Sequence, residues 1–382
     1  MGQRPGAMEG MELMAAGCID PGWWRGRRVW LTGHTGFKGS WLGLWLSEMG
    51  ARVSAVGLEP EGEPHLFHQL GLSSRLNHHI ADIRDAKAMR ELAEQAQPEV
   101  VLHLAAQPLV RRSYRDPLGT WATNVQGSLH VLEALRTLQH PCAVVMVTTD
   151  KVYANREWDY GYRENDRLGG HDPYSASKAA AEIAIASWRH SFCGPAAHQT
   201  PHLAIATARA GNVIGGGDWA EDRIVPDAMR ALAASQAIPV RNPQATRPWQ
   251  HVLEPLGGYL LLAERLLEAH GASNSNSYTD AFNFGPSLEA NRNVRDLIEQ
   301  ALVHWPGRWT DLSDSAAPHE AGRLHLQVDK AHHQLHWRPR WEFDTTVERT
   351  VAWYRQVQQQ HDAAEACCLN DLNAYVNPSP TH

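Results

Sequence analysis

Short apolar stretches alternate with amphipathic stretches over the first 210 residues of the chain. The run Arg28–Thr32 is rich in β-branched and apolar residues and ends at a glycine, which is typical of a strand. Further strands are expected over Val53–Val56, Val100–Leu104, Ala143–Thr148 and Leu203–Ala208. Because the runs near 100 and 143 are continuously apolar, we expect them to be buried on both faces, as in a parallel sheet.

Between these strands, three stretches carry apolar residues at helical spacing. They cover residues 40–49, where Trp41 and Trp45 fall on one face, and residues 85–95 and 121–138. Regular alternation of strands and helices predicts an α/β fold with a doubly wound parallel sheet of the Rossmann type.

The organisation changes after residue 210. Glycine, proline and arginine concentrate in loops beyond Gly211, so we assign residues 26–210 to the Rossmann domain. Residues 211–360 are expected to form mainly a smaller C-terminal α/β substrate-binding domain, with some segments returning to the Rossmann domain. We expect residues 1–25 to be a disordered extension and residues 361–382 to be a tail.

Charge, hydropathy and cysteine spacing argue against several classes of protein. The formal net charge of −7 argues against a nucleic-acid-binding surface. No apolar run approaches the roughly 18 to 20 residues of a membrane span, and the N-terminus lacks the pattern of a secretory signal. The five cysteines have neither disulfide nor zinc-ligand spacing, which favours the reducing cytoplasm. The adjacent histidines at 78–79 and 332–333 have no Cys or carboxylate partners at ligand spacing, so we predict no metal site.

Three glycines lie between the first strand and the first helix. Gly33 can make a tight turn, Gly36 lets the backbone approach a pyrophosphate, and Gly39 allows the helix to pack closely on the strand. The order strand, glycine loop, helix predicts a bound dinucleotide. A glycine-rich turn that binds no ligand is the alternative.

Acidic residues further along bear on the cofactor. Glu59 lies 20 residues after Gly39, where a carboxylate would bind the ribose 2′-OH, and no Arg stands beside it to accept a 2′-phosphate. This favours NAD over NADP. Asp82 and Ile83 follow the third strand, where adenine contacts are expected, although Asp82 could equally be a simple helix cap.

Two groups of residues suggest acid–base chemistry. Tyr174 and Lys178 are four residues apart and share one face of a helix. A nearby ammonium and an oxidised nicotinamide would favour tyrosinate, which could act as a base. Thr149, Asp150 and Lys151 follow a strand and add groups that a plain alcohol dehydrogenase would not need. An incidental Tyr and Lys on an amphipathic helix is the alternative for the first pair.

The whole pattern resembles the extended short-chain dehydrogenase/reductase family over residues 25–355, and within that family it resembles the CDP-glucose 4,6-dehydratases closely. The matching runs are residues 32–42, 105–111, 155–158, 209–219 and 247–254. Residues 209–219 and 247–254 are much more specific than the glycine loop, and they separate this subfamily from epimerases and from dTDP-glucose dehydratases.

The resemblance implies a lyase that uses NAD to convert CDP-glucose into the 4-keto-6-deoxy sugar nucleotide and water, for deoxysugar and surface polysaccharide synthesis. Tyr174 would take the O4 proton, Thr149 would orient O4, and Asp150 would protonate O6. Lys151 stands where commoner dehydratases have Glu as the C5 base, so Lys151 could be that base or could stabilise the enolate. Lys178 could also bind the nicotinamide ribose.

The resemblance and the strand ends further imply binding residues. Asn124 would act by ordering the backbone near the Tyr–Lys site, and the helices at 121–138 and 174–190 would pair two copies into a homodimer or homotetramer. A 4-epimerase and a non-catalytic NAD-binding regulator remain as alternatives. Further cofactor contacts would come from Thr35, Phe37, Leu104, Ala105 and Gln107, and substrate contacts from Gln107, Arg111, Asn212, Arg223, Arg247, Trp249 and Gln250.

Overall fold

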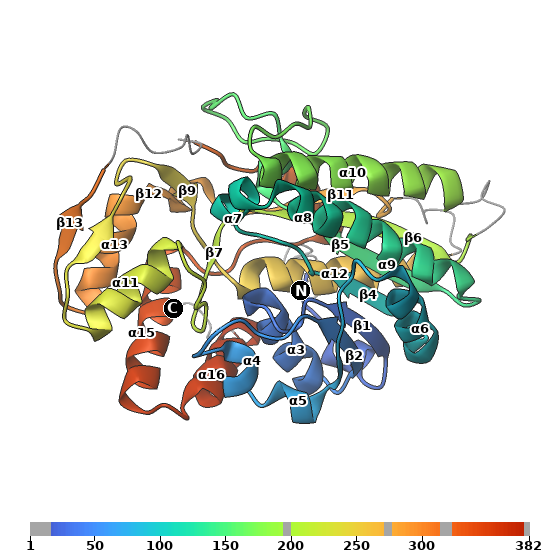
Figure 1. The fold of residues 1–382 in the computed structure, drawn as a ribbon, viewed down its shortest axis with the longest axis horizontal. Coiled ribbons are helices and arrows are strands. Elements are labelled where there is room, and N and C mark those ends of the chain that lie inside the picture. Colours follow the sequence, from blue (N-terminus) through green and yellow to red (C-terminus); the bar gives the residue numbers. More distant parts are fainter. Residues whose placement is uncertain (1–16, 194–199, 271–276, 314–322, 378–382) are drawn as a thin grey trace, which may run out of the picture.

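A seven-stranded parallel sheet forms the centre of the computed structural model, which describes residues 17–193, 200–270, 277–313 and 323–377. The strands follow the order β11-β6-β5-β4-β1-β2-β3 (Figure 1). The predicted doubly wound parallel sheet is therefore confirmed. The strands are β1 (Arg28–Thr32), β2 (Arg52–Gly57), β3 (Asn77–Ile80), β4 (Val100–His103), β5 (Cys142–Val147), β6 (Leu203–Ala210) and β11 (Ala281–Phe284).

Alternate residues of the strands enter two different cores. On one face, Leu31 and Val145 pack with the buried residues of α3 (Phe37–Glu48) and α12 (Leu253–Glu268). On the other face, Trp30 and Val144 pack against α6 (Ala86–Ala96), α9 (Ser128–Ala134) and α10 (Pro173–Phe192). Helices thus cover both faces, as the continuous apolar runs predicted.

The strand order reverses between β1 and β4, which are neighbours in the sheet. Thr32 at the end of β1 pairs with Val56 of β2 and with His103 of β4. In open parallel sheets, ligands bind beyond the carboxyl ends of the strands at such a reversal. The fold therefore places a binding crevice between the loops that follow β1 and β4.

Most of the chain after residue 210 forms a smaller lobe at one side of the sheet, seen at the left in Figure 1. Strand β11 instead returns to the main sheet beside β6. Within the lobe, β8 pairs with β13, β9 with β12, and β7 with β10. These elements are β7 (Val213–Ile214), α11 (Ile224–Ala233), β8 (Ile238–Val240), β9 (Thr246–Pro248), β10 (Gln250–His251), β12 (Asn291–Asn293), α13 (Val294–His304), β13 (Trp309–Asp311) and α15 (Phe343–Gln359). Helix α14 (Asp329–Leu335) instead contacts β11 and α12 of the main sheet.

The helical stretch predicted over residues 121–138 is confirmed, since the backbone stays helical from Pro117 to Thr137. It contains a π-helical turn over Ala122–Gly127, in which Asn124 is buried. Such single π turns recur at functional sites. The other short helices are α4 (Leu66–Gln69), α5 (Leu72–Arg75), α7 (Val110–Arg115), α8 (Pro117–Trp121) and the 3₁₀ turns Leu135–Thr137, Asp150–Val152 and Leu288–Ala290.

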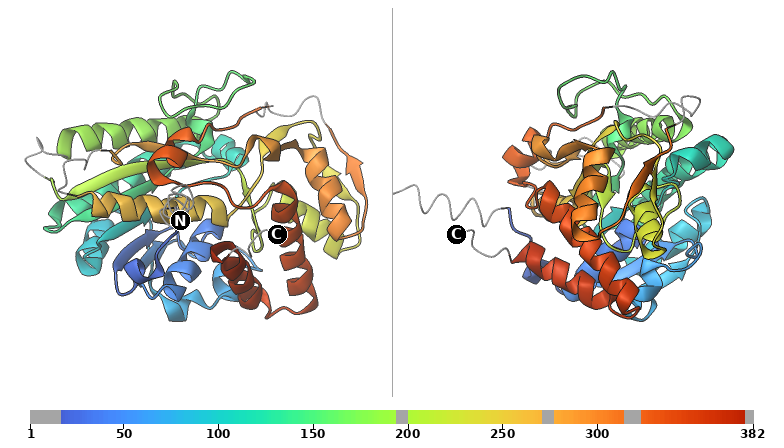
Figure 2. Two further views of the ribbon diagram at one scale, coloured as in Figure 1. Left: turned by 180° about the vertical axis from the view of Figure 1, so that it is seen from behind. Right: turned by 90° about the vertical axis from the view of Figure 1, so that its left-hand side faces the viewer.

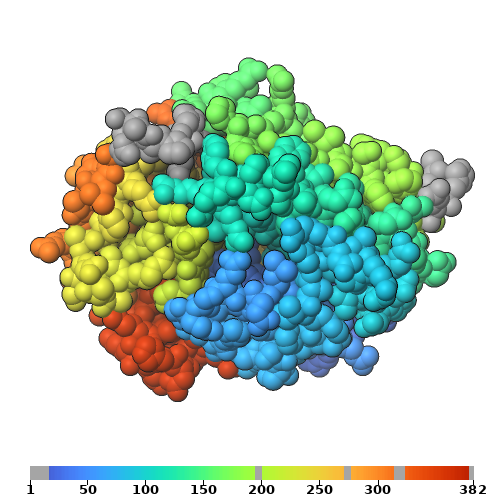
Figure 3. All heavy atoms as spheres, viewed as in Figure 1, coloured from blue at the N-terminus to red at the C-terminus, as the bar shows by residue number. Residues whose placement is uncertain are grey.

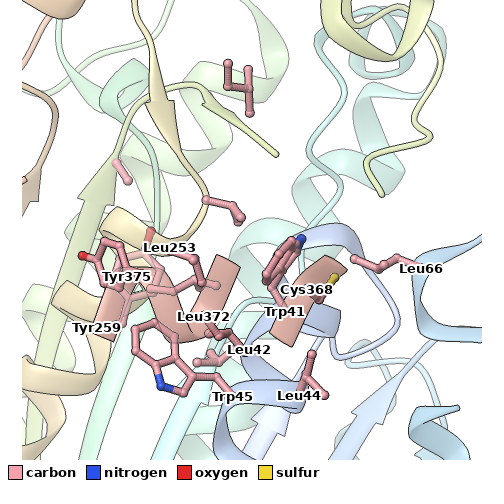
Figure 4. Packing of buried hydrophobic residues seen from close by; sticks show 14 of the residues in the cluster. Trp41, Leu42, Leu44, Trp45, Leu66, Leu253, Tyr259, Cys368, Leu372 and Tyr375 are labelled. Carbon is pink, nitrogen blue, oxygen red and sulfur yellow. The ribbon is translucent and has the colours of Figure 1, made fainter. Parts of the chain in front are cut away.

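The prediction of a loose C-terminal tail is wrong for the described residues. Helix α16 (Ala364–Val376) buries Cys368, Leu372 and Tyr375 in the main core, and Figure 4 shows these side chains beside those of α3. The ring of Tyr375 lies edge-on to Trp45, with centroids 5.8 Å apart. Seen from behind in Figure 2, α16 lies between α15 and the N-terminal layer. Apolar residues at positions 368, 372 and 375 have the spacing of one helix face.

The N-terminal prediction also needs correction. Residues 1–16 lie outside the described part of the chain, but α2 (Pro21–Trp24) belongs to the folded unit. The Trp24 indole is buried and donates a hydrogen bond of 2.6 Å to the Glu264 carboxylate. None of the described helices is long and apolar enough to cross a membrane.

Candidate active site

A cavity of 1960 Å³ opens at the carboxyl edge of the sheet, between the sheet loops and the smaller lobe. Figure 3 shows the surface hollowed between the blue N-terminal region, the teal helices and the yellow lobe. Pockets for one small molecule have volumes of about 300 to 1,000 Å³. The cavity therefore has room for two ligands of nucleotide size.

The glycine loop forms one wall of this cavity. Gly33 has a left-handed backbone with φ of 77°, and a Cβ there would lie 2.6 Å from the Ala105 nitrogen. A Cβ on Gly39 would lie 2.0 Å from the Gly33 oxygen, so the close packing of α3 on β1 requires glycine. Gly36 caps α3, and Thr35 and Phe37 line the cavity with all three glycines. A helix N-terminus that opens into a cavity fits an anionic group such as a pyrophosphate.

Other predicted cofactor residues lie along the same wall. Asp82, Ile83, Leu104 and Ala105 all line the cavity. The Asp82 carboxylate accepts hydrogen bonds from the Arg84 guanidinium at 2.9 and 2.6 Å, and these bonds hold the pKa of Asp82 below its ordinary value. Asp82 is thus already paired with a cation of its own loop.

Glu59 is placed differently from the prediction. Strand β2 ends at Gly57, and Gly57 and Leu58 line the cavity, whereas the Glu59 side chain is exposed and lies outside the lining. The sequence places Glu59 just past the end of the second strand, and the structure shows that its side chain turns to solvent there. The ribose contact predicted for Glu59 is therefore not supported by this geometry.

Gln107 and Asn124 form a scaffold next to the cavity, and neither lines it. The Asn124 amide accepts from the Gln107 nitrogen at 2.9 Å and donates to the Gln107 oxygen at 3.1 Å and to Ser177 Oγ at 2.9 Å. Ser177 in turn donates to the Tyr174 carbonyl at 2.7 Å. Asn124 therefore joins the loop after β4 to the helix that carries Tyr174, and the Gln107 side chain is engaged by Leu109 and Thr120.

The Tyr–Lys pair begins helix α10, which is capped by the Asp172 side chain. Tyr174 is buried except for an edge that lines the cavity, and the amine of Lys178, one turn further, donates to the Val147 carbonyl at 3.3 Å. Burial raises the pKa of Tyr174 to about 12, against a hydrogen bond with Thr149 that lowers it. Burial also lowers the pKa of Lys178 to about 8.

These values differ from the expectation of a tyrosinate favoured by a nearby ammonium. Burial is the largest influence on Tyr174, and the positive charge that lowers its pKa in this structure is Arg223. Burial of Tyr174 therefore favours its neutral phenol form. The sequence could show that the lysine shares a helix face with the tyrosine, but it could not show the extent of burial.

Thr149, Asp150 and Lys151 follow β5 in a 3₁₀ turn. Thr149 donates to Asp150 Oδ1 at 3.0 Å and accepts from the Lys151 nitrogen at 3.4 Å. Asp150 is almost fully buried, and its Oδ2 lies only 3.0 Å from where a Cβ of residue 211 would be, so Gly211 leaves the space that the carboxylate occupies. The half-buried Lys151 lines the cavity.

Lys38, within the glycine loop, is a site residue that the sequence analysis missed. It lines the cavity, and its amine lies 3.4 Å from the Tyr259 hydroxyl. Burial, followed by the charge of Arg223, lowers the pKa of Lys38 to about 8, while Asp150 raises it. The sequence did contain a signal for this role, because Lys38 is a cation immediately before the third glycine of the loop and its neighbours in the loop are apolar or small.

The other half of the cavity is basic. Arg111, Asn212, Arg223 and Arg247 all line it, as predicted for substrate contacts. Arg223 is paired with Asp218 at 2.8 Å, and Arg111 with Asp222 at 3.3 Å. Eleven Lys and Arg residues line the cavity against seven Asp and Glu, although the whole chain carries a net charge of −7. The local field therefore favours anionic ligands.

Two predicted substrate residues serve the architecture of the smaller lobe. Trp249 lines the cavity, but its indole nitrogen donates to the Arg292 carbonyl at 2.9 Å. Gln250 is fully buried on β10, donates to the Phe284 carbonyl at 3.3 Å and lies outside the lining. The predicted contact of Gln250 with a ligand is therefore corrected, because its side chain is fully buried against the Phe284 carbonyl.

Comparison with known proteins identifies relatives along nearly the whole chain. Residues 31–350 match the family model described as GDP-mannose 4,6 dehydratase. The chain is 44% identical to a CDP-glucose 4,6-dehydratase of Salmonella typhimurium, over 94% of this chain and 99% of that protein. It is 25% identical to a dTDP-glucose 4,6-dehydratase of Xanthomonas campestris, over 85% and 93% of the two chains.

Solved structures share the fold. An epimerase from Methanothermobacter thermautotrophicus matches with a TM-score of 0.72 and 22% identity, covering 93% of this chain and 98% of that chain. A dTDP-glucose 4,6-dehydratase from Streptomyces venezuelae with NAD bound matches with a TM-score of 0.71 and 23% identity, covering 87% and 98%. At these identities the likeness concerns the fold.

Proposed function

Because the chain belongs to the GDP-mannose 4,6 dehydratase family, we propose that it is a 4,6-dehydratase that acts on CDP-glucose. The products would be CDP-4-keto-6-deoxyglucose and water, the former serving deoxysugar synthesis for a surface polysaccharide. The observation that carries the proposal is the meeting of Thr149, Lys151 and Tyr174 at one cavity, with Asp150 hydrogen-bonded to Thr149 beside it. The chain also aligns over 94% of its length with a CDP-glucose 4,6-dehydratase.

NAD fits the wall formed by the glycine loop. Gly33 and Gly39 bring α3 close to β1, and the helix N-terminus at Gly36 leaves space for a pyrophosphate. Asp82 and Ile83 would border the adenine. Bound there, NAD would supply the acceptor for the C4 hydride and the donor of that hydride to C6.

The substrate pyrophosphate would lie in the basic half of the cavity. Arg223 and Arg247 line this half, and a guanidinium carries five N–H donors in a planar fork that suits phosphate oxygens. Arg223 uses one nitrogen for Asp218 and keeps other donors for a ligand. Asn212 adds a neutral amide beside them.

The side chains at the reacting end divide the proton chemistry. Tyr174, oriented by Thr149, would receive the proton of O4, and the ketone formed at C4 acidifies the hydrogen on C5. Lys151 would take the C5 proton or stabilise the enolate, and Asp150 would protonate O6 so that water leaves. Asp150 faces the space left by Gly211, away from bulk water. Exclusion of water strengthens these charged contacts.

The test is to incubate the purified protein separately with CDP-glucose, UDP-glucose and dTDP-glucose and to determine product masses. Loss of one water from CDP-glucose alone supports both the reaction and the nucleotide preference. An unchanged mass with an inverted C4 would instead establish a 4-epimerase. No change in any of the three sugars, with bound NAD in a folded protein, would favour a regulator or another substrate.

We also propose that the protein forms a homodimer through α8 and α10. These helices contact each other, and Leu118, Trp121 and Ile183 expose 81%, 40% and 60% of their surfaces. Exposed large apolar residues on adjoining helices indicate an interface.

Sedimentation should give a dimer for the wild type and a monomer for Leu118→Glu with Ile183→Glu. Leu288→Glu, in the smaller lobe and 65% exposed, is the matched control that should leave the dimer intact. A wild-type monomer would contradict the proposal, and a tetramer would require a second interface.

The cysteines support a reducing compartment, and we propose the cytoplasm. None of the five, all of which the structure describes, forms a disulfide, although Cys367 and Cys368 are adjacent and buried. Nucleotide sugars are also charged, which keeps them in the compartment where they are made. Fractionation of the source cells would test this location.

A further inference from the structure

One buried histidine lies at the end of β4, between the wall formed by the glycine loop and the helix that carries Tyr174. His103 exposes 2% of its surface and lies outside the cavity lining. Its Nδ1 lies 2.7 Å from Thr32 Oγ1, and its Nε2 lies 3.0 Å from Ser128 Oγ. Both ring nitrogens are therefore hydrogen-bonded within the protein, and neither is directed at a ligand.

The neighbouring hydrogen bonds fix the direction of these two contacts. Ser128 Oγ donates its single hydrogen to the Asn124 carbonyl at 2.8 Å, so it accepts from Nε2–H of the ring. Thr32 Oγ1 accepts from the Ala105 nitrogen at 3.2 Å and donates its own hydrogen to Nδ1. Burial lowers the pKa of His103 to about 3, which favours the neutral ring that this pattern requires, with one donor and one acceptor.

This path of hydrogen bonds reaches both sides of the reacting centre. At one end, Ala105 lines the cavity and packs against the first glycine of the glycine loop, on the wall proposed for NAD. At the other end, the Asn124 side chain donates to Ser177 Oγ at 2.9 Å, and Ser177 Oγ donates to the Tyr174 carbonyl at 2.7 Å. His103 is thus the middle of a path that joins the cofactor wall to the helix of the catalytic tyrosine.

A buried imidazole at residue 103 needs partners for both of its nitrogens, because an unpaired buried polar group destabilises the fold. The preceding residues of β4, Val100–Leu102, are apolar, and an apolar side chain at residue 103 would leave the hydroxyls of Thr32 and Ser128 without this partner. A fully satisfied buried network favours a single arrangement of the groups that it joins. The ring therefore fixes the two sides relative to each other, which an apolar side chain of similar size would not do.

We propose that His103 is a positioning residue, which holds the π turn of Asn124 against the end of β1 and so sets the place of Tyr174 relative to the nicotinamide. The inference rests on the proposed dehydratase function, because it concerns the oxidation at C4. His103 acts through Asn124, and its ring exchanges no proton with a ligand. A displacement of about 1 Å at the reacting atoms costs about 100-fold in rate, so a small shift along this path reaches the chemistry without any contact with the substrate.

The test measures the transient formation of bound NADH after rapid mixing of the NAD-loaded protein with CDP-glucose. His103→Leu removes both hydrogen bonds of the ring, and the rate of NADH formation should fall about 100-fold. The half-saturating concentration of CDP-glucose should change by less than about threefold, because Arg223 and Arg247 lie outside this path. His103→Gln keeps an acceptor oxygen and a donor NH₂ group, and it should recover about tenfold of the lost rate.

A double-mutant cycle separates this role from a general loss of stability. Asn124→Ala breaks the path one step closer to Tyr174. If His103 acts through Asn124, adding His103→Leu to Asn124→Ala should slow NADH formation by less than about threefold further. Two effects that multiply would overturn the inference, and so would a His103→Gln variant as slow as His103→Leu.

Thr32→Val and Thr350→Val form a matched pair of controls. Each replaces a buried threonine hydroxyl by a methyl group, but Thr350, on α15, donates to the Thr346 carbonyl at 2.7 Å and does not belong to the path. Thr32→Val should slow NADH formation about tenfold, whereas Thr350→Val should keep the wild-type rate at a similar unfolding midpoint. Equal rates in the two variants would contradict the role of His103 in an active protein. A wild type that removes no water from CDP-glucose would refute the proposed function itself, and this inference with it.

Discussion

Glu254 offers a test of how burial sets the stability of the fold. Its carboxylate, fully buried at the start of α12, accepts hydrogen bonds from the Arg340 and Trp341 nitrogens at 2.9 and 2.7 Å and from the Tyr375 hydroxyl at 3.0 Å. It thereby ties α12 to the segment before α15 and to α16. Burial nevertheless outweighs these bonds and raises the pKa of Glu254 from 4.5 to about 7.

The sign of the pH effect follows from that shift. Between pH 4.5 and about 7, the folded protein holds a proton on Glu254 and the unfolded chain does not. The free energy of unfolding therefore falls as the pH rises through this window. Each pKa unit corresponds to about 1.4 kcal/mol, so the full shift removes about 3 kcal/mol from the stability above pH 7.

Glu254→Gln replaces the titrating group by one that is always neutral. The amide oxygen can still accept from the Arg340 and Trp341 nitrogens, and the variant loses about 1 kcal/mol through the poorer match of its NH₂ group. We therefore expect the variant to be less stable than the wild type by about 1 kcal/mol near pH 4, below the window in which the wild type loses stability. Near pH 8 it should be more stable by about 2 kcal/mol, because it avoids the buried charge.

Urea unfolding of both proteins at several pH values and constant ionic strength measures this difference. Tryptophan fluorescence and circular dichroism should give coincident transitions, which supports treating unfolding as two-state. Other buried carboxyls, such as Glu264 and Asp371, also titrate, but they contribute equally to both proteins and cancel in the comparison. Stability curves that run parallel from pH 5 to pH 8 would refute the reasoning, because Glu254 would then titrate alike in the folded and unfolded states.

Two further predictions concern the core. Arg209→Met should lower the free energy of unfolding by about 3 to 5 kcal/mol, because it leaves the buried Glu182 carboxylate without its cation at 2.7 Å. Adding Glu182→Gln should restore at least half of that loss in urea unfolding, and a loss under about 1 kcal/mol in the single variant would contradict the prediction. Gly216→Ala should lower the free energy of unfolding by about 1 to 3 kcal/mol, because its Cβ would lie 2.0 Å from Trp353 Cγ. In the matched control Gly285→Ala, the nearest atom to the new Cβ lies at 3.4 Å, so this variant should keep the wild-type melting temperature. Equal melting temperatures for the two alanine variants would show that the Trp353 ring moves aside at little cost.

The parts of the fold that sequence patterns predicted are those that local chemistry determines. The central residues of β1, β4 and β5 are buried on both faces, so residues 29–31, 100–102 and 142–147 are apolar. The glycine loop was predictable for a similar reason, since Gly33 and Gly39 sit where the backbone leaves no room for a Cβ. These requirements leave a mark in the local sequence, although the residue that crowds Gly33, Ala105, comes from the loop after β4.

The residues whose predicted positions differ from the structure are placed by contacts between distant segments of the chain. Glu59 has the right spacing along the chain, but the end of β2 decides which side chain faces the cavity. Gln250 follows a residue that lines the cavity, but its side chain is buried and donates to the carbonyl of Phe284, a residue of the distant strand β11. Helix α16 looked like a tail because its apolar face is narrow, and only the partner surface on α3 shows why Cys368 and Tyr375 are buried.

The positive charge of the site is also set by contacts between distant segments, and its ion pairs show how the protein accommodates several cations in one cavity. Cations from four separate segments, Lys38, Arg111, Arg223 and Arg247, converge on one cavity in a chain of net charge −7. Several of them have an acidic neighbour, as Arg223 has Asp218, so the ligand-free protein does not carry an array of unopposed positive charges. An arginine paired through one nitrogen keeps N–H donors for phosphate. Such pairing holds the side chain in place before a ligand arrives, which lowers the entropy lost on binding.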